Sequence, residues 1–392
     1  MASLSALLCV KRSVALGALV VCAACGVSAD HLQISESGYG AYEVSLSPWS
    51  DGLIVAWYDT RDGNAEIYLR RVDAEGRGIG PEHRLTDDPE QSYEADIDAA
   101  GDRLAVVWYD KDAEGVLTAR LAFWSVAEGL VGQTVLSATG GATRNPVVRT
   151  DGAERVFVAW IEADGAGGEA VWGGWWSVRG DELEAPVEIG PAGSTTWNLN
   201  AEIDEAGVAY VVFDAQIDTL AEELYVARLD GTRVEIRRAT DDDGHRSKYP
   251  DLAIDGGRAA LTWFDERDGQ QEVYLFSGTL DALISLETSG RRITNTPGPS
   301  IGAYVAWNAD RIGLTWCDAT DGAHDVYFQA FDVGGEPVRP AQRVTTTPES
   351  SLIPAIRPWQ DGFAVAWNEL APGPSGMHDA ATRSEVRLAI VR

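Results

Sequence analysis

Leu53-Ile-Val-Ala-Trp57-Tyr-Asp59 decides the fold, because this stretch of sequence returns six more times along the chain. Each copy is an apolar run that ends in an anchor residue, and an acidic residue stands two positions after the anchor. The anchors are Trp57, Trp108, Trp160, Val212, Trp263, Trp316 and Trp367. Successive anchors are 51 to 53 residues apart, so the sequence consists of seven copies of one repeat.

Each repeat contains four segments that have the character of strands. The first is exemplified by Glu94–Asp98, and the second is the anchor strand, whose continuous apolar run fits burial on both faces. The third recurs in the manner of Glu66-Ile-Tyr68, and the fourth in the manner of Arg84-Leu-Thr86. Periods near 50 residues with four strands are typical of propeller blades. We therefore predict an all-β fold, a seven-bladed β-propeller with four antiparallel strands per blade.

The two ends of the repeated region predict how the ring closes. The last repeat stops at 385–392, which reads as a third strand with no fourth strand after it. His31-Leu-Gln-Ile-Ser35, near the other end, matches the fourth-strand segment His83-Arg-Leu-Thr86. We expect the N-terminal strand to complete the last blade, which removes a free sheet edge.

The repeat resembles the units of bacterial propellers related to the TolB propeller domain. The resemblance rests on Arg61-Asp62-Gly63, Ile67-Tyr68 and Leu85-Thr86, and again on Arg267-Asp268-Gly269 with Val273-Tyr274. It covers residues 31 to 392 and is specific for architecture rather than for function. The period is longer than in that family, and no separate N-terminal domain of the TolB kind is evident.

Residues 1–29 have the pattern of a signal peptide. Lys11 and Arg12 precede an apolar run of about a dozen residues, which is too short to span a bilayer stably. Cleavage before Cys25 would give a lipoprotein with lipidated Cys25, and cleavage before Asp30 would give a soluble secreted protein. Both alternatives predict export, to the outer membrane or periplasm as a lipoprotein or to the medium, with residues 30–392 as the propeller.

Composition limits the partners. The chain has 61 acidic and 31 basic residues, a formal net charge of −30. Such a surface repels phosphate backbones and anionic lipid, so we expect no nucleic acid and no membrane contact other than a lipid anchor. Cys317 is the one cysteine after residue 25, so no disulfide can form within one mature chain. A monomer is expected.

The acidic residues two positions after the anchors are expected to be structural. They are Asp59, Asp110, Glu162, Asp214, Asp265, Asp318 and Glu369. Some precede Asp-Gly turns, where a carboxylate accepts backbone N–H groups and glycine adopts a positive φ. Because active sites rarely repeat seven times, a site is better sought where the repeats differ.

The loops that join the fourth strand of one repeat to the first strand of the next vary most. One carries a tryptophan in a polar segment, another is strongly charged, and a third contains an arginine. The candidate ligand-binding residues in these loops are Trp197, Asn200, His245, Lys248, Tyr249 and Arg144. Asp241, Asp242 and Asp243 offer clustered oxygens of the kind Ca²⁺ prefers, but they lack the spacing of an EF-hand. We expect no cofactor, with Ca²⁺ as the alternative.

No catalytic constellation is evident in the sequence, and the five histidines show no metal-ligand spacing. The leading hypothesis is a non-catalytic propeller that binds a protein or a glycan through the variable loops of one face. The alternative is a carbohydrate-active hydrolase or lyase, sialidase-like or glycosidase, with carboxylates at the propeller mouth. Two acids with raised pKa values facing each other in that mouth would favour the alternative.

Overall fold

The computed structural model describes residues 31–36, 40–152, 154–285, 290–370 and 383–392. These residues form antiparallel sheets, with one six-residue helix, α1 (Leu280–Ser285), between a third and a fourth strand. Residues 1–30, which include the predicted signal peptide and Cys25, lie outside the described residues. No helix among the described segments is long and apolar enough to cross a membrane.

Five of the sheets have four strands each, and a sixth has seven. The first and second repeats form β2 (Ala41–Trp49), β3 (Gly52–Asp59), β4 (Glu66–Val72), β5 (Gly78–Arg84), and β6 (Gln91–Ala100), β7 (Arg103–Lys111), β8 (Leu117–Ser125), β9 (Gly129–Val135). The third and fourth form β10 (Thr143–Thr150), β11 (Arg155–Ala163), β12 (Glu169–Ser177), β13 (Glu182–Ile203), β14 (Ala209–Gln216), β15 (Glu223–Asp230), β16 (Arg233–Arg238). The fifth and sixth form β17 (Ser247–Asp255), β18 (Arg258–Asp265), β19 (Glu272–Thr279), β20 (Arg291–Arg292), and β21 (Ser300–Asn308), β22 (Arg311–Asp318), β23 (Asp325–Asp332), β24 (Gln342–Arg343). The seventh forms β25 (Ser351–Trp359), β26 (Gly362–Leu370), β27 (Ser384–Val391), which β1 (Leu32–Gln33) joins.

The seven-stranded sheet departs from the predicted separation into four-stranded units. Its cause is β13, a single 22-residue strand that serves two repeats. The first part of β13 pairs with β12 up to Ser194, and the part from Thr195 pairs with β14. Because the chain stays extended between these parts, the fourth strand of the third repeat continues directly into the first strand of the fourth.

The N-terminal strand joins the last repeat, as the sequence predicts. Leu32 pairs with Leu388 and Gln33 pairs with Arg387, so β1 becomes the outer strand next to β27. The Ile34 amide continues the pairing by donating to the Val386 carbonyl over 2.8 Å. The last repeat therefore obtains its fourth strand from the opposite end of the described chain.

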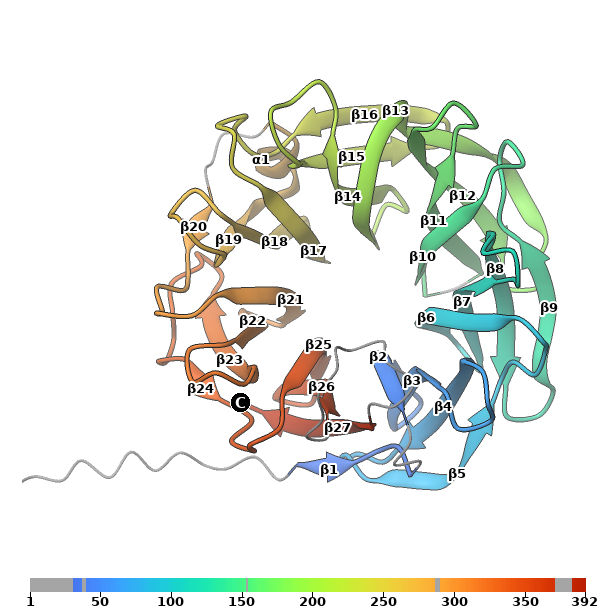
Figure 1. Ribbon diagram of the computed structural model, residues 1–392, viewed down its shortest axis with the longest axis horizontal. Helices are drawn as coiled ribbons and strands as arrows, with labels where there is room; N and C mark the ends of the chain where they lie inside the picture. The colour runs from blue at the N-terminus through green and yellow to red at the C-terminus, as the bar shows by residue number, and fades with distance from the viewer. Residues whose placement is uncertain (1–30, 37–39, 153, 286–289, 371–382) are drawn as a thin grey trace, which may run out of the picture.

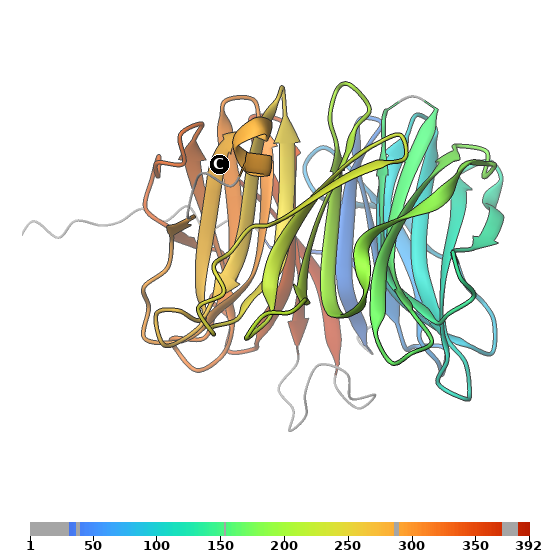
Figure 2. The same cartoon turned by 90° about the horizontal axis from the view of Figure 1, so that it is seen from above.

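The sheets stand around a central axis with their first strands innermost (Figure 1). β25 of the last repeat lies against β2 of the first. The strands run between two opposite faces, on which the connections gather (Figure 2). The hydrophobic clusters lie between neighbouring sheets: one joins Ile54 to Val106, and another joins Val55 to Ala366. Each sheet buries its apolar faces only because a neighbour covers them.

The repeated carboxylates are buried hydrogen-bond acceptors, in agreement with the structural role expected of them. The indole Nε1 of the anchor tryptophan donates to the carboxylate two residues later, for example over 2.8 Å from Trp108 to Asp110. The same contact occurs at Trp57, Trp160, Trp263 and Trp367. A serine of the first strand also donates to the acid, as Ser247 does to Asp265 over 2.9 Å. The carboxylate thus ties the first strand to the second and to the turn that follows.

The recurring residues of the third and fourth strands hold each other. Glu272 of β19 accepts from Arg292 over 2.7 Å and from Thr294 over 2.5 Å, and the Thr294 hydroxyl accepts from the Val273 amide. The other repeats place Glu66 against Arg84 and Asp325 against Arg343. This pairing explains why Glu-x-Tyr and Arg-x-Thr recur together in the sequence.

We expect Asp265→Ala to destabilise the protein by about 3 kcal/mol, because it leaves buried donors of Trp263, Ser247 and Arg267 without their acceptor. Urea unfolding measures the change, and Glu205→Ala, at an exposed turn position, is the control, expected within about 0.5 kcal/mol of the parent. Equal stability of the two variants would contradict a structural role for the repeated acids.

Candidate functional site

Every innermost strand carries a bulge that redirects its side chains. The register between the first and second strands of each repeat shifts once, for example between Tyr42 and Ser45 in β2 and between Tyr93 and Asp96 in β6. Five residues other than glycine adopt a left-handed conformation at these bulges, with φ between 47° and 56°. They are Glu43, Glu94, Asn145, Tyr249 and Ile353. In the sixth repeat the position is Gly302, which adopts the same conformation without strain.

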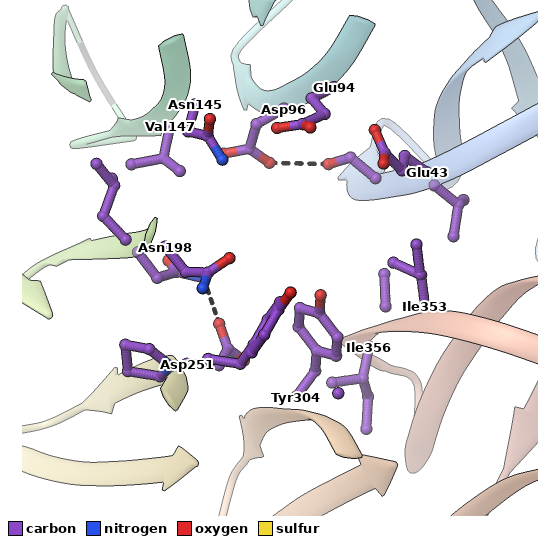
Figure 3. Close-up of a pocket in the computed structure, with 18 of the residues that line it drawn as sticks. Glu43, Glu94, Asp96, Asn145, Val147, Asn198, Asp251, Tyr304, Ile353 and Ile356 are labelled. Carbon is purple, nitrogen blue, oxygen red and sulfur yellow. Dashed lines mark hydrogen bonds between the residues drawn. The ribbon is translucent and has the colours of Figure 1, made fainter. Parts of the chain in front are cut away.

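The bulges surround a central cavity of about 570 Å³. This volume lies within the range of small-molecule sites. Every repeat contributes lining residues, and Figure 3 shows Glu94 and Asp96, Asn198 and Asp251, and Tyr304 arranged around the opening. The cavity therefore combines carboxylates, amides and phenols with an apolar wall that includes Ile353 and Ile356.

Part of the lining is held by a chain of hydrogen bonds that runs from repeat to repeat. The Ser45 hydroxyl donates to Asp96, and the Arg149 guanidinium donates to Asp96 over 2.7 Å and to the Asn200 side-chain oxygen over 2.8 Å. Asn200 in turn donates to Asp251, whose second oxygen accepts the Val305 amide over 2.7 Å. Both oxygens of Asp96 and of Asp251 accept hydrogen bonds, so these two carboxylates hold neighbouring innermost strands in position.

The acidic and basic side chains along this series of hydrogen bonds offset one another's charge. Burial opposes ionisation of Asp96, but the positive charge of Arg149 holds its pKa below the ordinary value. Arg149 also pairs with Glu202 over 3.2 Å, and Arg357 acts on the same acids. Burial nevertheless raises the pKa of Glu202 to about 7 and that of Asp251 to about 6. Arg149 is therefore committed to carboxylates of the protein, whereas Arg357 donates to the Ile356 carbonyl and acts on the acids through its charge.

Glu43 and Glu94 form a second group of acids in the cavity, and they lack such compensation. Burial raises the pKa of Glu43 well above its ordinary value, and the charge of Glu94 raises it further. Burial also raises the pKa of Glu94, although the Tyr109 hydroxyl donates to it over 3.0 Å and Arg144 acts in the opposite direction. The Oε2 atom of Glu43 is shielded from solvent and has no hydrogen-bond partner among the described residues.

Tyrosines surround this acidic pair. Burial, followed by the charges of the two glutamates, raises the pKa of Tyr58 and of Tyr109. Tyr249 and Tyr304 line the cavity itself, and their hydroxyls make no hydrogen bond to other described residues. The phenols remain protonated at neutral pH and offer both a donor and an acceptor to a ligand.

The candidate residues from the sequence divide into three groups. Asn200 and Tyr249 line the cavity. Trp197, Lys248 and Arg144 meet beside it: the Lys248 ammonium lies 4.6 Å from the centre of the Trp197 ring, and Arg144 donates to the Trp197 carbonyl. His245 is exposed, does not line the cavity, and donates its backbone amide to Asp243.

Glu43, Glu94 and Tyr304 line the cavity but are not among the binding residues that the sequence predicts. Glu94 lies in a segment recognised as an innermost strand, but a strand pattern does not reveal that a bulge turns its side chain toward the axis. One sequence pattern could have pointed to these residues: the residue type at the left-handed position of the first strand varies between repeats. It is Glu in the first and second repeats, Asn in the third, Tyr in the fifth, Gly in the sixth and Ile in the seventh.

The structure offers no metal centre within the described ranges. No group of three or more His, Cys, Asp or Glu residues there could hold an ion. Asp242 and Asp243 of the charged loop accept the backbone amides of Leu220 and His245, which is turn chemistry. Cys317 is buried, and burial raises the pKa of its thiol to about 12.

Replacing both Glu43 and Glu94 by Gln should change how stability depends on pH. A carboxyl whose folded pKa is raised contributes stability that is full below its unfolded pKa and is lost as pH rises through the folded pKa. The parent should therefore lose more stability than the double variant between about pH 5 and about pH 8. Urea unfolding at both pH values measures this, with Glu202 and Asp251 common to both proteins. Parallel pH profiles would contradict the raised pKa values.

Comparisons with known proteins give structural matches and no sequence family. No family model matches the chain, and no curated protein matches it. The propeller domain of the Trilobed protease from Pyrococcus furiosus is similar with a TM-score of 0.52 and 10% identity, over 84% of this chain and 91% of that chain.

Two further similar structures are those of an arabinanase and of a lectin. The α-L-arabinanase of Penicillium chrysogenum, solved with arabinobiose, has a TM-score of 0.54 and 11% identity, over 74% of this chain and 90% of that chain. The BP39L lectin of Burkholderia pseudomallei has a TM-score of 0.53 and 15% identity, over 84% of this chain and 96% of that chain. At these identities the likeness concerns the fold alone, and it shows that the chain has the β-propeller fold.

Proposed function

We propose that this chain is a seven-bladed propeller that binds a glycan in its central cavity. The observation that carries the proposal is the cavity of about 570 Å³, whose lining combines carboxylates, amides and two tyrosine hydroxyls with apolar wall residues. Sugars present hydroxyl groups and apolar ring faces together, so a cavity of mixed character suits them. Seven sequence repeats and the pairing of β1 with β27 support the blade count.

The rim of the cavity supports the same ligand class. Trp197 is 42% exposed and Tyr249 is 46% exposed, which is unusual for large aromatic side chains in this protein. Both are held from below by Asp214, which accepts their backbone amides over 3.1 Å and 2.9 Å. Rigid aromatic side chains at a rim supply contact area to a sugar ring at little entropic cost. Similarity in fold to a lectin and to an arabinanase is compatible with this proposal.

Glycosidic bond cleavage is a second candidate, and the pair Glu43–Glu94 favours it. Glycosidases commonly use two carboxyl groups, one protonated as the acid and one ionised as the base or nucleophile. Two neighbouring glutamates with raised pKa values can hold one proton between them near neutral pH. In this candidate Glu43 and Glu94 are the catalytic residues, and Trp197 and Tyr249 position the chain of sugars.

Export is part of the proposal. The pattern of residues 1–29 supports a signal peptide, and lipidation of Cys25 would hold the propeller at the cell envelope as a monomer. In that location an acidic propeller would meet extracellular and envelope glycans. The first described strand after Cys25, β1, lies on the outside of the ring (Figure 1).

We expect Trp197→Ala and Tyr249→Ala to weaken glycan binding by about tenfold each, which is about 1.4 kcal/mol. Their free energies of unfolding should change little, because both side chains lie at the surface and neither belongs to the buried core. A glycan array identifies the ligand, and calorimetry measures the affinities. Asp265→Ala is the matched control, since it should lose stability and keep its affinity when folded. Unchanged affinity in both aromatic variants would overturn the rim as the entrance of the site.

The hydrolase candidate is tested on the same ligand by measuring new reducing ends. Glu43→Gln and Glu94→Gln should each reduce the rate by at least about a hundredfold, because each removes a proton-transfer or nucleophilic group. If the parent binds the glycan and releases no product over many hours, the protein is a binding module and the second candidate falls.

A further inference from the structure

The two groups of acids in the cavity differ in their counter-charges. Asp96 and Glu202 face Arg149 directly, and Asp251 accepts from Asn200 and from a backbone amide. Glu43 has no comparable partner: the charge that acts on it is that of Glu94. One part of the cavity is thus neutralised by an arginine, and another holds two acids with which no arginine or lysine of the described residues forms an ion pair.

The basic residues closest to this pair are already engaged. Arg144 acts on Glu94, but its Nη2 lies 2.8 Å from both carboxylate oxygens of Glu169 and donates to the Thr196 carbonyl over 2.6 Å. Lys248 lies over the Trp197 ring and pairs with Glu222 over 3.5 Å. Neither side chain can turn toward the glutamates without breaking these contacts.

We propose that the cavity binds a glycan that carries a free amino group, with its ammonium lying between Glu43 and Glu94. This inference rests on the glycan-binding function proposed above. An ammonium has three donors, and the acceptors without a hydrogen-bond partner among the described residues are the shielded Oε2 of Glu43 and the hydroxyls of Tyr249 and Tyr304. The ligand class is a deacetylated amino sugar, of which glucosamine oligomers are the simplest example.

The chemistry disfavours the acidic alternatives. A uronic or sialic acid would need a free arginine or lysine. Arg149 is paired with Asp96 and Glu202, and the charge of Arg357, the other arginine among the described lining residues, acts on the same two acids. A neutral sugar would fill the space but would leave the Glu43 oxygen beside a second negative charge. An ammonium satisfies that oxygen and reverses the repulsion, so it gains more from this site than a hydroxyl does.

Calorimetry with three tetrasaccharides of equal length tests the proposal: β-1,4-linked glucosamine, its fully N-acetylated form, and the glucose tetramer. At about pH 6 and moderate salt the amines carry their protons, and we expect the glucosamine tetramer to bind about tenfold or more tightly than either of the others. Glu43→Gln and Glu94→Gln should each abolish this preference. Glu205→Gln, which removes one exposed charge from a residue that does not line the cavity, should retain it.

A second measurement does not depend on the variants folding. Because an ammonium favours the ionised carboxylates, binding should release protons from the pair, whose pKa values are raised in the free protein. Titrations in two buffers of different ionisation enthalpy give the number of protons released. No proton release on binding of the glucosamine tetramer would overturn the proposal.

The remaining outcomes separate this inference from the proposed function. If the neutral tetramers bind as tightly as the amine, the glycan site stands and the amino-sugar inference fails. If no glycan from any source binds, both fail. If Glu43→Gln keeps the preference, the amine is held by the general negative charge of the surface, which overturns the inference. Tighter binding of a lysine-containing peptide than of all three sugars would likewise overturn it in favour of a protein ligand.

Discussion

A buried carboxylate two residues after the anchor organises each repeat. In the fifth repeat the acid can be buried because it is satisfied by an indole, by a serine of the first strand and by the backbone amide of the following turn. These donors come from different strands, so the acid fixes the register of the sheet as well as its end. The fourth repeat is informative because its anchor is Val212, which has no indole to donate. Asp214 there accepts the amides of Trp197, Asn198 and Tyr249 instead. The loss of one tryptophan thus releases an acceptor that now positions the exposed aromatic rim.

The bulges of the innermost strands show how a regular ring acquires an irregular interior. All seven innermost strands bend at a register shift, so the bulge belongs to the architecture. The left-handed conformation is costly for residues other than glycine, and most so for the β-branched Ile353. That cost is borne because the bulge turns side chains toward the axis without altering the buried second strand. Residue identity at the bulge is then free to vary, and the variation places carboxylates beside phenols.

The repeat period, the four strands of a repeat and the β1–β27 pairing could be predicted from sequence, because each leaves a pattern repeated many times. The continuity of β13 could not, since nothing in Pro191–Ser194 distinguishes an extended connection from a turn. The variable loops led to Trp197 and Tyr249: Tyr249 lines the cavity, and the backbone amides of both residues donate to Asp214. Glu43 and Glu94 escaped notice because polar residues in an innermost strand normally suggest only solvent exposure. Their importance depends on a bulge and on which neighbours carry charge, and both are properties of the assembled ring. His245, by contrast, was predicted from its distinctive loop but does not line the cavity.

The distribution of charge has two consequences that act at different ranges. The formal charge of −30 surrounds the molecule with a negative field that concentrates cations and speeds their approach, although salt screens it within about 10 Å. Inside the cavity the screening is weaker, and there the relevant charges are few. Arg149 cancels the acids beside it, whereas Glu43 and Glu94 repel each other in a partly desolvated space. A ligand drawn in by the outer field would be selected by the inner pair, because a cationic group between the two carboxylates relieves their repulsion without a shared proton. The net charge of the surface thus affects the association rate of a ligand, and the Glu43–Glu94 pair affects which bound ligand dissociates slowly.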